Sequence, residues 1–191
     1  MTFASRAAAA SSPVRKAARP TLRSQVFAAI ILLALCASNP PVHAAGHQAN
    51  LSLPDVTFRT SQDESVRTAD LKGDVAFVSL WAIDCKACSV MRGSVERLNQ
   101  RFAAQGVRFL SVNEDAAQQS WKDYMAQNPS ASIEVWDKDH AFRRHIHASH
   151  LPAALIVDRS GQIRWRSGWA ADAEARASTQ LSSVLQEPPP K

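Results

Sequence analysis

Aspartate and glutamate are absent from the first 44 residues of this 191-residue chain, a stretch that contains five arginines and lysines. The remaining residues hold 17 basic and 17 acidic side chains, so the formal net charge of +5 belongs entirely to the first stretch. A basic chain often binds nucleic acid. Because the charge excess is confined to the leader, we expect no nucleic-acid partner for the rest of the chain.

Motifs for nucleotide binding and for serine-based catalysis are also missing. The sequence contains no glycine-rich phosphate loop, no dinucleotide fingerprint and no recognisable Ser-His-Asp set. Internal repeats are absent, and low complexity is limited to the tail EPPPK. We therefore expect no bound cofactor, and we expect the chemistry to come from the protein's own side chains.

The N-terminal segment has the layout of a secretory signal peptide. Its basic residues are followed by an apolar run at residues 26–37 and by a small-residue exit at residues 42–44. The apolar run is too short for a comfortable membrane span. An uncleaved N-terminal anchor is the alternative, whereas the bulky Leu35 disfavours a lipoprotein signal ending at Cys36. Each version predicts export of the folded part.

These features divide the chain into four parts. We predict a signal peptide or N-terminal anchor at residues 1–44, a linker at 45–50, a folded domain at 51–186 and a flexible tail at 187–191. If Cys36 leaves with the signal, Cys85 and Cys88 are the only cysteines of the mature chain. A domain of this size buries a core without a disulfide, and a bridge over two intervening residues restricts the unfolded chain little. The cysteine pair is therefore expected to serve chemistry rather than stability.

Strand-like and helix-like segments alternate from about residue 51 onward. Residues 75–82 form an almost unbroken apolar run rich in β-forming residues, which is typical of a central strand covered on both faces. After Asp84 the apolar residues fall at helical spacing, and Gly106 marks the end of this helix. Further strands are expected at residues 107–112, 132–136, 154–158 and 162–169, and further helices at 116–127, 139–146 and 171–186. This order predicts an α/β domain with a mixed central sheet flanked by helices.

The motif WAIDCKAC lies where the buried strand passes into the helix. Free N–H groups and the helix dipole stabilise an anion at the first turn, which lowers the pKa of a cysteine placed there. Cys85 therefore suits the attacking thiolate, and Cys88, three residues later on the same face, suits the thiol that resolves a mixed disulfide. The positive charge of Lys86 favours the thiolate, whereas Asp84 opposes it. This placement predicts a redox-active dithiol.

Half of a zinc site is the alternative interpretation of the two cysteines. The side chains that could complete it are the downstream histidines His140, His145, His147 and His150. More than fifty residues and two predicted strands separate them from the cysteines, unlike the short loop of a zinc knuckle. The basic segment that contains Arg143 and Arg144 is expected to be a solvated helix face. A redox dithiol is the better interpretation.

Four segments together resemble the exported TlpA-like thiol:disulfide oxidoreductases of bacteria, which have the thioredoxin fold. The segments are DLKG at residues 70–73, WAxxCxxC at 81–88, GVRFLSVN at 106–113 and LPAALIVDRSGQI at 151–163. The resemblance covers residues 51–186 and implies a thioredoxin-like sheet with an N-terminal strand extension. It also implies an enzyme whose Cys85–Cys88 disulfide exchanges with the thiols and disulfides of partner proteins.

The resemblance further implies a groove for the partner chain beside the dithiol. In this family the proline that matches Pro152 is cis and faces the cysteines, where its retention is a functional constraint. The groove residues expected here are Trp81, Asp84, Lys86, Leu151 and Pro152. Relatives of this type usually act as reductants in the cell envelope, for example on apocytochrome c or metal-site cysteines, and are recharged by a membrane electron donor.

Several positions depart from the family pattern. Asp84 replaces the aromatic residue that usually precedes the first cysteine, and Ala153 replaces the common Thr after the proline. Met91 and Gly93 stand where many relatives carry a Glu and a helix-kinking Pro, so the usual buried acid for proton transfer is not evident. Ser79 occupies the strand position where cytosolic thioredoxins have a buried Asp, and this departure fits the exported branch.

Copper handling is the second functional hypothesis. His150 lies shortly before the proline, similar to the copper-ligand His of Sco-type chaperones, and two thiolates with an imidazole suit Cu(I). In this alternative Cys85, Cys88 and His150 hold the metal, although Sco-type proteins use CxxxC. A peroxidase of the peroxiredoxin type is disfavoured, because Val78 and Ala82 occupy the two diagnostic positions before the first cysteine.

Overall fold

The computed structural model describes residues 51–189. The predicted signal peptide or anchor, the predicted linker and Cys36 lie outside the described residues. In chain order the elements are β1 (Thr57–Thr60), β2 (Ser65–Arg67), the 3-10 helix η1 (Thr68–Leu71), β3 (Val75–Trp81), α2 (Lys86–Phe102), the 3-10 helix η2 (Ala103–Gln105), β4 (Val107–Asn113), α3 (Gln118–Gln127), β5 (Ile133–Trp136), α4 (Ala141–His145), β6 (Ala153–Val157), β7 (Ile163–Gly168) and α5 (Ala173–Leu185). None of the helices in this part of the chain has the length and apolar character needed to cross a membrane.

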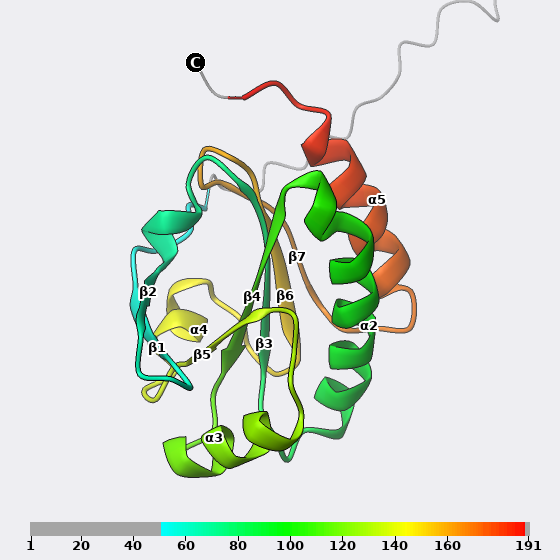
Figure 1. The fold of residues 1–191 in the computed structure, drawn as a ribbon. Helices are drawn as coiled ribbons and strands as arrows, with labels where there is room; N and C mark the ends of the chain where they lie inside the picture. Colours follow the sequence, from blue (N-terminus) through cyan, green and yellow to red (C-terminus); the bar gives the residue numbers. More distant parts are fainter. Residues whose placement is uncertain (1–50, 190–191) are drawn as a thin grey trace, which may run out of the picture. The chain divides into compact units, whose positions relative to one another are not determined.

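The strands of the described residues form one seven-stranded sheet in the order β2-β1-β5-β4-β3-β6-β7 (Figure 1). β3, β4 and β5 run parallel, and antiparallel strands extend the sheet on both sides of them. The predicted α/β class with a mixed central sheet is therefore confirmed. The predicted N-terminal strand extension is the β1–β2 hairpin, which joins the sheet through β5.

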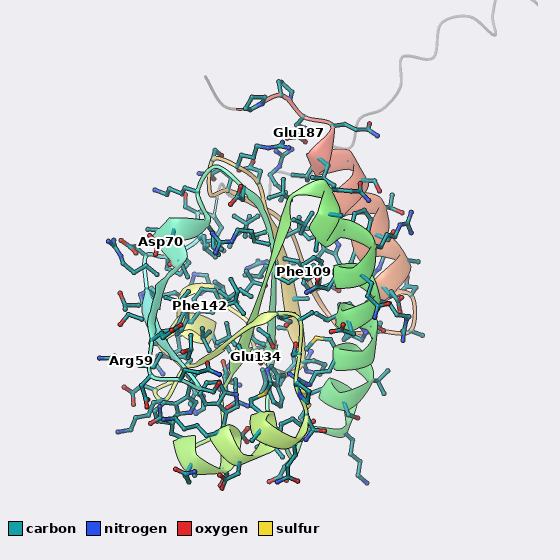
Figure 2. All side chains as sticks on the ribbon, in the orientation of Figure 1. Arg59, Asp70, Phe109, Glu134, Phe142 and Glu187 are labelled. Carbon is teal, nitrogen blue, oxygen red and sulfur yellow. A yellow bond between two sulfur atoms is a disulfide. The ribbon has the colours of Figure 1, made fainter. Side chains whose placement is uncertain are left out.

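The central strand β3 is covered on both faces, and all seven of its residues are buried. Phe77 and Trp81 face a core shared with α2 and α5, whereas Val78 faces a second core to which α4 contributes Phe142. Figure 1 shows α2 and α5 side by side on one face of the sheet and α4 on the other. In Figure 2, Phe109 lies on the side of α2 and Phe142 on the side of α4. Two covered faces explain why this strand is an unbroken apolar run in the sequence.

Helix α2 begins directly after the loop that follows β3 and packs along the sheet. Cys85 is its N-cap residue, within the turn around Asp84 where the sequence predicts the helix to begin. The buried apolar residues of the helix recur at helical spacing: Met91, Val95, Leu98 and Phe102. Gly106 adopts a left-handed conformation with φ of 89° after the short turn η2, and it ends the helical segment as predicted. The N-terminus of α2 is thereby placed at the carboxyl end of β3.

Candidate active site

Cys85 and Cys88 form a disulfide at the N-terminus of α2, with an S–S distance of 2.07 Å. Cys85 is partly exposed, whereas Cys88 is completely buried. The backbone N–H of Cys88 donates a hydrogen bond to Cys85 Sγ at 3.2 Å. An N–H group at the start of a helix stabilises negative charge on the atom that it faces. The pair therefore offers one accessible cysteine and one that is closed to solvent.

The loop between β3 and α2 is held by polar residues at the end of β4. Asp115 accepts a hydrogen bond from the backbone N–H of Ile83 at 3.0 Å, and Asn113 Nδ2 donates to the same carboxylate at 2.6 Å. The backbone N–H of Glu114 donates to the Trp81 carbonyl at 2.9 Å. These bonds fix the backbone that leads into the dithiol. The sequence prediction does not include Asp115, although polar residues directly after a buried strand are the signal that could have pointed to it.

The Leu151–Pro152 peptide bond is cis, which confirms the conformation implied by the resemblance. Strand β6 begins at the next residue, and Ala153 pairs with Leu80 of β3 in antiparallel register. The proline and Trp81 are the next residues outward along these two strands, so they lie at the same edge of the sheet. The structure thus brings Leu151 and Pro152, called the proline segment below, to the edge of the sheet where the chain enters α2.

The predicted groove residues differ in their accessibility. Asp84 and Lys86 are exposed on either side of Cys85, Leu151 is half-buried and Pro152 is buried. Trp81 is only 1% exposed, so it packs beneath the surface and offers no area to a partner chain. The exposed and half-buried residues are therefore the ones available for contact with a partner.

The guanidinium group of Arg92, a residue of α2, stacks on the ring of Trp81. The guanidinium carbon of Arg92 lies 4.0 Å from the ring centroid, and Arg92 Nη1 forms an ion pair with Glu134 Oε1 of β5 at 3.0 Å. The Arg92 side chain is 17% exposed and that of Glu134 is 7% exposed. Glu134 pairs in register with Ser111, which pairs with Ser79. Ser79, Ser111 and Glu134 therefore form a row of polar residues across β3, β4 and β5.

Burial raises the pKa of Glu134, and the positive charge of Arg92 opposes this rise. Desolvation acts in this direction because the charged form of a carboxyl group loses its hydration in the interior. Met91, at the helix position where relatives carry an acid, is an ordinary buried core residue. The buried acid on this side of the sheet comes instead from β5, a strand that the motif pattern does not mark.

A second buried carboxylate, that of Glu114, lies at the end of β4 with its side chain 1% exposed. Its Oε2 is 3.3 Å from Arg143 Nε and 3.4 Å from His140 Nδ1. Burial raises the pKa of Glu114, while the charges of Arg143 and His140 lower it. Arg143 was predicted to belong to a solvated helix face. That prediction is wrong for Arg143, which is half-buried because it pairs with this carboxylate.

The histidines considered as metal ligands are not gathered around the cysteines. Within residues 51–189 no three His, Cys, Asp or Glu side chains are grouped so that they could hold a metal ion. The ring of His150 contacts Ser149 Oγ through Nδ1 at 2.8 Å and lies against Gly168 of β7. The three side chains of the copper alternative, Cys85, Cys88 and His150, are therefore not arranged as a preformed site.

The family model that matches this sequence is Redoxin, over residues 48–181. The chain belongs to the Redoxin family. The match spans the CxxC pair, the loop that Asp115 holds and the cis proline, and it confirms the enzyme class predicted from the sequence, a thiol-disulfide oxidoreductase. A comparison with curated proteins finds no match.

Solved structures with the same fold confirm the thioredoxin-like architecture of this Redoxin. A protein assigned as the thiol:disulfide interchange protein DsbE of Chlorobium tepidum has 20% identity and a TM-score of 0.67, covering 71% of this chain and 96% of its own. A secreted disulfide oxidoreductase of Mycobacterium tuberculosis, homologous to E. coli DsbE, has 14% identity and a TM-score of 0.59, covering 68% and 96%. An exposed lipoprotein thioredoxin of Streptococcus pneumoniae has 13% identity and a TM-score of 0.61, covering 69% and 100%. At these identities the likeness shows the fold, and it agrees with the predicted resemblance to TlpA-like proteins.

Proposed function

We propose that this Redoxin is an exported thiol:disulfide oxidoreductase that reduces disulfides of partner proteins in the cell envelope. The observation that carries the proposal is the asymmetry of the cysteine pair. Cys85 is accessible and its Sγ accepts the Cys88 N–H, whereas Cys88 is completely buried. An attacking thiolate must reach a second protein, and a resolving thiol needs to reach only the attacking one.

In the proposed reaction the Cys85 thiolate attacks one sulfur of a partner disulfide, and the other partner sulfur leaves as a thiolate. The Cys88 thiolate then attacks Cys85 Sγ, and the second partner thiolate leaves. Two electrons pass to the partner, and the Redoxin keeps the Cys85–Cys88 disulfide. A dithiol donor in the membrane returns the two electrons by the same exchange in reverse. The N–H group that faces Cys85 Sγ favours this cysteine as the thiolate in the reduced form.

Two observations support export and the reducing direction. The first 44 residues have the layout of a secretory signal, and solved structures with this fold include proteins described as secreted and as an exposed lipoprotein. The cell envelope is an oxidising compartment, so a further protein that forms disulfides adds little there. A protein that reduces disulfides is required wherever a cysteine must stay free.

Trapping of mixed disulfides tests the proposal. The full chain is expressed in its native host with Cys36→Ser throughout, so that every remaining thiol belongs to the pair. Cys88→Ser is expected to accumulate disulfide-linked partners through Cys85, and Cys85→Ser, the matched control, to accumulate none. Equilibration of the purified protein with glutathione buffers then gives its reduction potential, and a reductant must have a lower potential than the disulfide of the trapped partner. Failure of Cys85 to react with iodoacetamide near neutral pH in the reduced protein would overturn the proposal.

A further inference from the structure

A pocket of about 260 Å³ lies beside the proline segment, on the face of the sheet opposite to α2. Its walls are the segment that follows α4, the first residues of β6 and the last residues of β7. Ala153, the residue directly after the cis proline, is part of its lining. The pocket therefore begins at the residue that follows the cis proline.

The ionisable groups that line the pocket are an arginine and two histidines: Arg166, His147 and His150. The described residues of the lining include no aspartate or glutamate. One N–H of the Arg166 guanidinium donates to the Ile146 carbonyl at 3.1 Å. Among the ion pairs formed within residues 51–189, none involves Arg166. A guanidinium has several further N–H donors, so Arg166 keeps the capacity to bind an anion.

The position of His150 depends on the glycine that it covers. A Cβ atom added to Gly168 would lie 3.2 Å from His150 Nε2, so the imidazole would have to shift by a few tenths of an ångström. Ser149 Oγ contacts the ring at Nδ1, which leaves Nε2 as the ring nitrogen without a side-chain partner among the described residues. Ser149 and Gly168 thus position the imidazole of His150, which lines the pocket.

We propose that this pocket binds the carboxylate of an acidic side chain in the partner polypeptide, close in sequence to the cysteine that Cys85 attacks. The inference rests on the proposed function and adds a substrate preference to it. A carboxylate matches the forked donors of Arg166, and the imidazole of His150 adds a further polar contact. Because Ala153, which directly follows the cis proline, lines the pocket, the pocket lies within reach of a side chain of a polypeptide bound at Leu151.

Short peptides test the preference. Each contains one cysteine as a mixed disulfide with 2-mercaptoethanol, and Glu or Gln at a single position within a few residues of it. Cys85 of the reduced full chain, with Cys36→Ser, attacks the peptide sulfur, mercaptoethanol leaves as its thiolate, and Cys88 then releases the peptide thiolate. Acid quenching and mass spectrometry give the second-order rate constant for each peptide. At one or more positions the Glu peptide should react about fivefold faster than its Gln counterpart, which is the upper range for a partly exposed ion pair.

Two arginine variants distinguish binding in the pocket from a general effect of the protein's net charge on the Glu preference. Arg166→Gln should remove the Glu preference, so that Glu and Gln peptides react at equal rates at every position. Arg144→Gln removes the same charge from the exposed face of α4, outside the pocket lining, and should keep the preference. Gly168→Ala, which displaces the His150 ring, should weaken it. Equal rates for Glu and Gln peptides at every position, or a preference that survives in Arg166→Gln, would overturn the inference while the proposed function stands. A chain that reduces none of the peptides would overturn both.

Discussion

The ion pair between Arg92 and Glu134 gives a sharp test of how the dithiol edge is supported. The substitution Arg92→Met keeps a long side chain of similar reach but removes the charge and the stacking on Trp81. Both partners of the pair are largely buried, with side-chain exposures of 17% and 7%. Breaking one half of a buried pair leaves an uncompensated charge and costs about 3–5 kcal/mol, far more than for an exposed pair. With an unfolding entropy of about 0.3 kcal/mol/K for a domain of about 140 residues, Tm should fall by roughly 10 °C or more.

The loss of stability should also depend on pH, because Glu134 can escape its unpaired charge by binding a proton. Burial already raises its pKa above the ordinary value of 4.5, and loss of the Arg92 charge raises it further. Stability from such a group is fully present below the unfolded pKa and is lost as pH rises through the folded pKa. Because the folded-state pKa of Glu134 is higher in Arg92→Met than in the wild type, the variant loses stability over a wider pH range. Its deficit relative to the wild type should be small at about pH 4 and largest at about pH 8.

Urea unfolding of the oxidised full chain at several pH values measures this deficit. Arg97→Met is the matched control, because Arg97 lies on the same helix in an exposed pair with Glu174, and its loss should be much smaller. The double variant Arg92→Met/Glu134→Gln removes the charge that lacks a partner and should recover most of the stability at pH 8. If Arg92→Met costs less than about 1 kcal/mol at this pH, or if the double variant is no more stable than the single one, the reasoning from burial is refuted.

Three further substitutions test local features. Asp115→Ala should increase the hydrogen-exchange rate of the Ile83 amide and lower the free energy of unfolding by about 1–2 kcal/mol, since it removes a charged hydrogen-bond acceptor; an unchanged exchange rate would contradict this. Gly106→Ala should cost about 1–2 kcal/mol in urea unfolding, because φ is 89° and an added Cβ meets no atom within 4 Å, so backbone conformation alone is tested. Gly93→Ala, in the interior of α2 with ordinary helical φ, should instead stabilise the protein by about 0.5–1 kcal/mol, and the opposite sign would show that the glycine is needed for packing.

The features that sequence patterns predicted are those encoded by neighbouring residues. The strand at 75–82 and the helix after Asp84 each carry their own periodicity, and the change of period between them locates the cysteine pair. The glycine that ends the helical segment is likewise local, because its left-handed backbone is a property of one residue. Resemblance to a family added the cis proline, which no periodicity indicates.

The features that were missed depend on strand order and on side-chain direction. Glu134 belongs to a short strand of ordinary composition, and it meets Arg92 only because β5 pairs with β4 and α2 crosses above them. Arg143 has the sequence context of a solvated residue, and a buried carboxylate from another strand changes its role. Trp81 follows the same rule, since it shares a face with Phe77 and therefore points into the core rather than toward a partner. Such contacts join residues far apart in the chain, and local pattern cannot specify them.

The dithiol and the proposed partner-binding pocket lie on opposite faces of the sheet. On the face of α2, the cysteine pair rests on Trp81 and on the buried pair beneath it, so changes there alter the stability and the reactivity of the dithiol. On the opposite face, the pocket around Arg166 contacts neither cysteine, and its lining comes from β6, β7 and the segment after α4. A substitution in the pocket can therefore change which partner is bound without changing the chemistry of Cys85. This independence predicts that Arg166→Gln leaves the alkylation rate and the reduction potential of the dithiol unchanged while it removes the preference for acidic peptides, and a shift of either redox property would show that the two faces are coupled.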